Sequence, residues 1–194
     1  MEVILIKYNA GNIQSVSFAL ERLGIDFTIT DETEAIQHAD KVIFPGVGEA
    51  STTMKYLKDK KLDSVIRDLK QPVLGICLGM QLMCKYSEEN DTTCLGIFDE
   101  PVKRFIPKGD LKVPHMGWNQ LTLKDSWLDP ELENQNAYFV HSYYVPVNPY
   151  TSAVTDYITP FSAAMNRDNF YAVQFHPEKS AAAGELVLKS FLDL

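Results

Sequence analysis

Cysteine is scarce in this sequence, because the chain of 194 residues holds only three, at Cys77, Cys84 and Cys94. An odd number of cysteines without a C-x-x-C pair argues against a disulfide framework. A chain of this length does not need one, since it can bury roughly 70% of its unfolded surface on folding. We therefore expect reduced thiols, which leaves room for a reactive one.

The sequence also lacks an excess of positive charge and any long apolar run. Its 18 Lys and Arg residues face 26 Asp and Glu residues, for a net charge of −8, whereas nucleic-acid binding requires a basic surface. After Glu2 only four consecutive apolar residues occur, too few for a secretion signal, and no later run approaches a membrane span. These features argue against nucleic-acid and membrane partners and predict a cytoplasmic protein.

Histidine is equally sparse. The four residues are too scattered to suggest a zinc site: His38, His115, His141 and His176. We expect no metal and no other cofactor. Low-complexity tracts, repeats and Pro/Gly/Ser-rich linkers are missing as well, which predicts a single domain over residues 1–194.

The first half of the chain alternates strand-like and helix-like segments. Short apolar runs rich in β-branched residues, typical of strands covered on both faces, occupy residues 2–8, 27–31, 41–46 and 72–77. Between them, apolar residues recur at helical spacing in residues 13–23, 50–57 and 62–69. Such alternation predicts a parallel sheet with right-handed crossovers.

The pattern changes at Pro101, after which most segments resemble strands. These segments are residues 102–106, 119–124, 137–145, 152–157 and 170–176. Few helical segments separate them, so we expect antiparallel or mixed strands added to the parallel core. The last residues, 180–194, predict a helix despite Gly184. The expected fold class is α/β, with a mostly parallel sheet extended by further strands in the C-terminal half.

The motif "GICLG" places Cys77 between glycines where a strand becomes a helix. This is the form of a nucleophile elbow, in which a strained turn residue is flanked by glycines because larger neighbours would collide with the adjoining strand or helix. The helix N-terminus would favour the thiolate, which is the nucleophile. The alternative is that Cys77 is a small buried hydrophobe.

A thiolate nucleophile needs a base, and His176 in "YAVQFHPEKS" is the preferred one. It ends a strand whose alternation places Ala172, Gln174 and His176 on one face. Glu178, two residues later, can accept the other imidazole N–H and orient the ring. His38 is expected on the surface of a polar helix, and a hydrogen-bonding role stays open for the other two histidines.

The loop "FPGVGEA", residues 44–50, ends the third predicted strand with glycines at positions 46 and 48. Such a loop can direct backbone amides into an oxyanion hole, although it can also be an ordinary tight turn. In a doubly wound sheet, this loop and the Cys77 elbow share the carboxyl edge of the strands.

Together these segments resemble the class I, triad-type glutamine amidotransferases, through "PGVG", "GICLGMQ" and "QFHPE". Finer features resemble one branch, the glutaminase subunits of imidazole glycerol phosphate synthase: "YNAGNIQSV", "VPHMGWN", "YFVHSYY" and "FHPEKS". The resemblance runs from Tyr8 to Ser180. It implies a flavodoxin-like three-layer sandwich.

The resemblance also implies the chemistry and the residues that perform it. Cys77 attacks the glutamine side-chain amide, His176 transfers the proton and Glu178 orients His176. Amides of Val47 and Leu78 form the oxyanion hole, with Gly46 and Gly48 letting the loop reorganise. The implied substrate-binding residues are Gln81, His141, Ser142 and Tyr143.

By the same resemblance, the partner is a (β/α)8-barrel cyclase in a heterodimer that takes the ammonia. The cyclase converts the ribonucleotide PRFAR into imidazole glycerol phosphate and AICAR in histidine biosynthesis. Asn12, Tyr138 and Lys179 are implied at the docking face and ammonia entrance, although Lys179 also fits an ordinary solvated surface. The isolated subunit is expected to be nearly inactive.

Two departures from the family pattern affect docking and loop motion. The chain has "KYNAGN" where "DYG-x-GN" is usual, and Glu49-Ala50 where Ala-Phe is common. Three alternatives stay open: a glutaminase subunit of another synthase, such as those serving pyridoxal phosphate or anthranilate synthesis, a cysteine hydrolase of the same fold, and a binding module without turnover.

Overall fold

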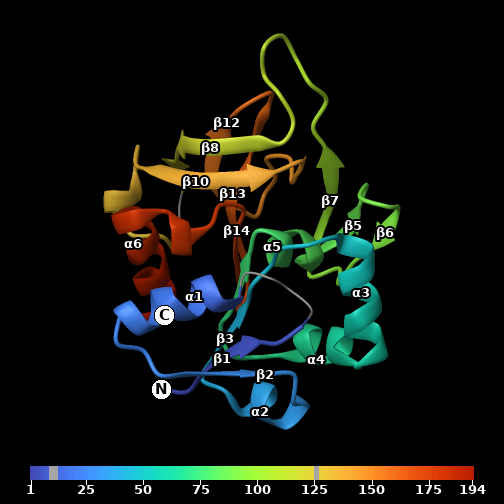
Figure 1. Ribbon diagram of the computed structural model, residues 1–194, viewed down its shortest axis with the longest axis vertical. Coiled ribbons are helices and arrows are strands. Elements are labelled where there is room, and N and C mark those ends of the chain that lie inside the picture. Colours follow the sequence, from blue (N-terminus) through green and yellow to red (C-terminus); the bar gives the residue numbers. More distant parts are fainter. Residues whose placement is uncertain (9–12, 125–126) are drawn as a thin grey trace.

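The computed structural model describes residues 1–8, 13–124 and 127–194 (Figure 1). Its main sheet has eight strands in the order β2-β1-β3-β4-β14-β13-β12-β9. Their bounds are β1 (Val3–Ile6), β2 (Phe27–Thr30), β3 (Lys41–Phe44), β4 (Val73–Ile76), β9 (Thr122–Leu123), β12 (Thr151–Asp156), β13 (Pro160–Arg167) and β14 (Phe170–Val173).

The strand directions divide this sheet into a parallel part and an antiparallel part. Strands β2, β1, β3, β4 and β14 pair in parallel, and β13, β12 and β9 continue the sheet in antiparallel pairs. Strands β4 and β14 are direct neighbours, with Ile76 opposite Val173. The residues that follow these two strands therefore meet at one edge of the sheet.

Helices cover both faces of the sheet. They are α1 (Ile13–Arg22), α2 (Thr33–His38), α3 (Ala50–Asp59), α4 (Leu62–Asp68), α5 (Leu78–Met83), α6 (Ala181–Leu192) and the 3-10 turns η1 (Pro130–Leu132) and η2 (Pro177–Lys179). Side chains alternate along β1, so Val3 and Leu5 pack with α1 and α6, whereas Ile4 and Ile6 pack with α2 to α5. Two buried clusters result, one on each face of the sheet.

Two smaller sheets complete the molecule (Figure 1). An antiparallel pair, β8 (His115–Gln120) and β10 (Asn136–His141), lies across the end of the main sheet. The N–H of His176, which follows β14, donates to the Tyr138 carbonyl of β10 at 2.9 Å. The second is ordered β11-β7-β5-β6. Its strands are β5 (Cys84–Ser87), β6 (Thr92–Thr93), β7 (Phe98–Arg104) and β11 (Tyr143–Tyr144).

The expected α/β class, with a mostly parallel sheet extended by antiparallel strands, is confirmed. The helix after Cys77 is shorter than its apolar pattern suggests, with 6 residues. The terminal helix forms as expected with Gly184 inside it. A Cβ at this position would lie 1.8 Å from the Pro177 carbonyl oxygen, so close packing requires the glycine.

Among the described residues, no helix combines the length and hydropathy that a membrane crossing requires. The described part of the chain likewise contains no group of three or more His, Cys, Asp or Glu side chains suited to hold a metal ion.

Candidate active site

Cys77 occupies the turn between β4 and α5 with φ 53° and ψ −106°. A non-glycine residue with positive φ has a strained backbone, and the surrounding hydrogen bonds hold Cys77 in this conformation. The Cys77 N–H donates to the Val173 carbonyl at 2.8 Å, and the Gln81 N–H donates to the Cys77 carbonyl at 3.2 Å. The sulfur is thereby fixed at the sheet edge, where the cysteine is 8% exposed.

The glycines on either side of Cys77 are needed for close packing, as the sequence predicts. A Cβ on Gly75 would lie 2.9 Å from the Met83 sulfur, and one on Gly79 would lie 2.1 Å from the Phe44 carbonyl oxygen. Because backbone atoms cannot move aside easily, Gly79 lets α5 approach the end of β3.

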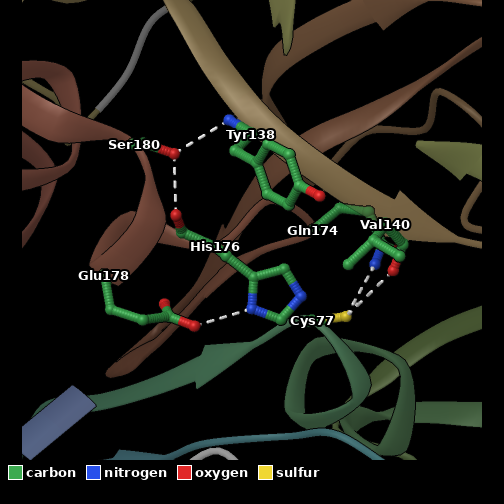
Figure 2. Close-up of polar contacts among 7 residues, drawn as sticks. All are labelled: Cys77, Tyr138, Val140, Gln174, His176, Glu178 and Ser180. Carbon is green, nitrogen blue, oxygen red and sulfur yellow. Dashed lines mark hydrogen bonds and ion pairs between the residues drawn. The ribbon is translucent and has the colours of Figure 1, made fainter. Parts of the chain in front are cut away.

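His176 and Glu178 follow β14 and approach the elbow from the neighbouring strand (Figure 2). The imidazole Nδ1 lies 2.7 Å from a Glu178 carboxylate oxygen, and the two side chains are 1% and 0% exposed. Burial alone would lower the pKa of His176, but its hydrogen bonds with Cys77 and Glu178 raise it from 6.5 to about 10. The raised pKa favours the protonated ring, whose positive charge faces the sulfur.

The Ser180 hydroxyl adds two hydrogen bonds to those that hold the backbone around His176. Ser180 Oγ donates to the His176 carbonyl at 2.7 Å and accepts from the Tyr138 N–H at 2.9 Å (Figure 2). This bridge joins η2 to β10 and fixes the direction from which the imidazole faces Cys77.

A pocket of about 350 Å³ opens beside the sulfur. Seven further residues that the sequence singles out line it: Val47, Gly48, Leu78, Gln81, His141, Ser142 and Tyr143. Gly46 is not among the lining residues and packs against α5, where a Cβ on it would meet the Gly79 nitrogen at 2.2 Å. Glu178 does not line the pocket but contacts His176, which does.

Two residues that the sequence analysis did not single out belong to this region. Glu89 contributes a carboxylate to the pocket lining, and burial raises its pKa. Gln174 lies beside Cys77, where its side-chain nitrogen is 3.6 Å from the sulfur. The sequence indicated Gln174 only through its position on the same strand face as His176. Glu89 lies in the turn after β5, and no motif marks it.

Two of the predicted docking residues, Tyr138 and Lys179, do not line the pocket. Tyr138 is half-buried on β10, and its ring meets that of the exposed Trp118 edge-on at 6.0 Å. Lys179 is exposed on η2. Asn12 falls outside the described residues.

The two remaining histidines are hydrogen-bonded, which answers the question left open by the sequence. His141 Nδ1 lies 2.7 Å from the Tyr143 carbonyl oxygen and so carries the proton. His141 Nε2 then accepts from His115 Nδ1 at 2.9 Å. Burial lowers the pKa of His141 to about 3 and of His115 to about 4, so both rings are neutral.

The loop from Pro45 to Gly48 rests against the elbow. The Leu78 N–H donates to the Gly46 carbonyl oxygen at 3.4 Å, so a carbonyl faces one of the amides predicted for the oxyanion hole. Gly48 has φ +124° and open space around it, a conformation that favours glycine.

Side chains hold this loop on both sides. Before it, the buried Tyr8 hydroxyl donates to the Pro45 carbonyl oxygen. After it, the Ala50 N–H donates to a Glu89 carboxylate oxygen at 2.8 Å, and the Glu49 carboxylate accepts from Asn90. The departure at Glu49 thus ties the loop to the turn that carries Glu89.

A cysteine at an elbow beside a histidine and a glutamate has the geometry of a triad-type cysteine enzyme. The sequence matches the family described as glutamine amidotransferase class-I over residues 4–193. The chain belongs to this class-I glutamine amidotransferase family.

Two individual proteins are similar to this chain over almost their whole length. Imidazole glycerol phosphate synthase subunit HisH of Bacteroides fragilis (strain YCH46) is 61% identical and aligns over 100% of both chains. The protein of that name from Vibrio parahaemolyticus is 44% identical over 100% of this chain and 98% of its own.

Solved structures share the fold at low sequence identity. The crystal structure of a glutamine amidotransferase matches with a TM-score of 0.76 at 18% identity, covering 98% of this chain and 97% of that one. PurLQS from Thermotoga maritima matches with a TM-score of 0.71 at 13% identity, covering 99% and 97%.

Proposed function

We propose that this chain is the glutaminase subunit of an imidazole glycerol phosphate synthase. It hydrolyses glutamine to glutamate and passes the ammonia to a cyclase subunit, which makes imidazole glycerol phosphate and AICAR from PRFAR. The observation that carries the proposal is the contact of His176 with Glu178 at 2.7 Å beside the Cys77 elbow, in a chain 61% identical to a HisH subunit. The cytoplasmic location stays a prediction from the sequence.

The proposed reaction begins with a thiolate on Cys77. The sulfur attacks the side-chain amide carbon of glutamine, and the proton held by His176 passes to the departing nitrogen to release ammonia. The resulting γ-glutamyl thioester is attacked by water, with His176 as the base, and glutamate leaves as the thiolate is restored. Glu178 keeps the imidazole oriented and stabilises its positive charge.

Glutamine carries an α-ammonium and an α-carboxylate besides the amide. The Glu89 carboxylate is suited to the ammonium group, because it supplies a negative charge to the lining of the pocket. The segment of His141, Ser142 and Tyr143 lines the same pocket and is suited to hold the rest of the amino acid.

The oxyanion hole requires the Val47 and Leu78 amides to face the same oxygen. In the resting arrangement, the Gly46 carbonyl accepts from the Leu78 N–H at 3.4 Å. Rotation of the Gly46–Val47 peptide would remove that carbonyl and turn an N–H toward the site. We propose that docking of the cyclase with its ligand favours this rotation, so the lone subunit has little activity.

A glutaminase that supplies a synthase gains from a direct passage, because ammonia released into water at neutral pH becomes ammonium, which is not a nucleophile. We propose that a (β/α)8-barrel cyclase docks over Tyr138 and Lys179. The exposed Trp118 beside Tyr138 extends this surface with apolar area.

The test measures glutamate release from glutamine by the chain alone, by the chain with a barrel cyclase and its nucleotide ligand, and by Cys77→Ala in the same mixture. Activity that needs the cyclase and disappears in Cys77→Ala supports both the thiol chemistry and the partner. Absence of activity with every cyclase tried, while Cys77 still reacts with a glutamine-like electrophile, would remove the synthase assignment and keep the nucleophile.

A further inference from the structure

Gln174 is a fully buried polar residue at the catalytic sulfur. Its side-chain nitrogen lies 3.6 Å from Cys77 Sγ, and its side-chain oxygen accepts from Gln81 Nε2 at 2.9 Å (Figure 2 for the sulfur contact). The triad chemistry described above uses neither of these two hydrogen bonds.

The surrounding hydrogen bonds determine which end of the Gln174 amide faces the sulfur. The Tyr143 carbonyl can only accept, so the Gln81 side-chain nitrogen lies on that side, at 3.0 Å. The same nitrogen has a second proton, which it donates to Gln174. A reversed Gln174 amide would set two NH₂ groups against each other, so the NH₂ group of Gln174 must face Cys77.

A fixed N–H donor acts differently on the two forms of a cysteine. A thiolate accepts a charge-assisted hydrogen bond, whereas a thiol sulfur is a weak acceptor. Besides His176, the sulfur also contacts the Val140 carbonyl at 4.0 Å, which can only accept and therefore interacts with S–H. Gln174 thus favours the ionised sulfur, and Val140 favours the protonated one.

We propose that Gln174 is the hydrogen-bond donor that stabilises the Cys77 thiolate, and that Gln81 holds the Gln174 amide in the orientation this requires. The proposal rests on the proposed function, in which Cys77 is the nucleophile. The donor assists twice: it stabilises the attacking thiolate, and it stabilises the same thiolate as it leaves the γ-glutamyl thioester. Gln174 therefore affects turnover, whereas it does not line the substrate pocket.

Two substitutions isolate the donor. Gln174→Glu keeps the shape and the oxygen that accepts from Gln81, but replaces the NH₂ group at the sulfur with a second oxygen. Gln174→Met removes the donor without adding charge. A matched control is Ser162→Ala on β13, which removes another fully buried polar group that bonds to Thr151 and Pro146 instead.

The measurement is the rate of Cys77 alkylation by iodoacetamide against pH, together with kcat and KM for glutamine, on the full chain in complex with the cyclase. Loss of a hydrogen bond to a charged group costs about 1.5–3 kcal/mol. We therefore expect alkylation at pH 7 and kcat to fall roughly tenfold or more in Gln174→Met, and further in Gln174→Glu, with KM nearly unchanged. Ser162→Ala leaves both rates near the wild-type values.

Wild-type alkylation rates and kcat in both Gln174 variants would overturn the proposal. If the variants do not fold, the proposal is tested on the ¹⁵N-labelled wild-type protein, by following the NMR resonances of the Gln174 side-chain amide against pH. One amide proton should move downfield as Cys77 ionises, while those of Gln71, which bonds to the Ile36 carbonyl, stay in place. Absence of that movement also overturns the proposal.

The outcome for Cys77→Ala separates this inference from the proposed function. If Cys77→Ala retains activity, Cys77 is not the nucleophile and both fall. If Cys77→Ala is inactive while the Gln174 variants behave as wild type, only the role of Gln174 falls.

Discussion

The backbone N–H of Leu78 donates to the carbonyl oxygen of Gly46 across 3.4 Å. This hydrogen bond joins the helix that begins at the nucleophile to the loop predicted to complete the oxyanion hole. The length is beyond the usual range for N–H···O bonds, so the contact is weak and easily exchanged. If the Val47 and Leu78 amides form the oxyanion hole as we propose, the resting structure has its triad assembled while a carbonyl still occupies one of these two amides.

We expect glutamine hydrolysis by the lone chain to be slower than that of the complex with ligand-bound cyclase by roughly 10²-fold or more, the usual effect of one oxyanion donor. Steady-state glutamate release with and without the cyclase measures this ratio. Turnover by the lone chain within a few-fold of the complex would mean that the Gly46 carbonyl does not block the site.

Substitution of Gly79 tests the close contact between α5 and β3. We expect Gly79→Ala to destabilise the fold by about 3 kcal/mol or more, because its Cβ would stand 2.1 Å from the Phe44 carbonyl oxygen, a backbone atom that cannot move aside easily. Urea unfolding provides the measurement. Gly96→Ala is the control, since Gly96 has φ +72° with nothing within 4 Å and should cost only about 1–2 kcal/mol. Equal losses in the two variants would contradict the packing argument.

Glu89 provides a test of substrate recognition. We expect Glu89→Gln to raise KM for glutamine about tenfold with a smaller change in kcat, because an amide can still accept from the Ala50 N–H but no longer carries the charge that pairs with an ammonium group. The neighbouring Glu88→Gln is the control, since Glu88 bonds to the Arg104 N–H and does not line the pocket. An unchanged KM in Glu89→Gln would exclude Glu89 from recognition.

The His115–His141 pair makes stability sensitive to acid. Burial lowers the two folded-state pKa values to about 4 and about 3, from 6.5. Between pH 6.5 and 4 the unfolded chain therefore binds more protons, and the free energy of unfolding falls as the pH falls, by up to about 1.4 kcal/mol per pH unit for each histidine. We expect His115→Phe to lose about half of this slope between pH 6.5 and 5. An identical slope in the variant would contradict the assignment.

The order of elements in the first half and the triad positions could be predicted because their signals are local. A glycine-flanked cysteine after an apolar run indicates an elbow, and a histidine at the end of a strand with a glutamate two residues later indicates its base. The pairing of β4 with β14, which brings the two together, is seen only in the structure. Strand β13 was missed because its sequence, "PFSAAMNR", is rich in small side chains. Pairing with β12 and β14 makes it a strand, and that pairing is not visible locally.

The contacts of Glu89 and Gln174 could not be predicted for a related reason. Glu89 meets Ala50 across 39 residues of sequence, and Gln174 meets Cys77 across 97. Alternation places Gln174 on the correct face, but it does not say which end of an amide points to sulfur. That detail depends on Tyr143 and Gln81, which lie on other elements.

Tyr8 connects the N-terminal strand to the resting loop and provides the last test. Its hydroxyl donates to the Pro45 carbonyl, next to the peptide that must rotate, and burial followed by the charge of Cys77 raises its pKa, so the hydroxyl stays protonated. Tyr8→Phe removes this hydrogen bond and preserves the ring that packs on Phe44 at 5.4 Å.

Loss of one neutral hydrogen bond that favours the resting loop is worth about 1 kcal/mol, so we expect activity of the lone Tyr8→Phe chain to rise about fivefold. Activity of the complex should stay nearly constant, because the cyclase already selects the rotated loop, and the degree of activation should therefore fall. Tyr56→Phe is the control, since its hydroxyl bonds to Asp31 on the surface instead. If Tyr8→Phe lowers both activities equally, the hydroxyl supports the site as a whole and does not hold the loop in its resting state.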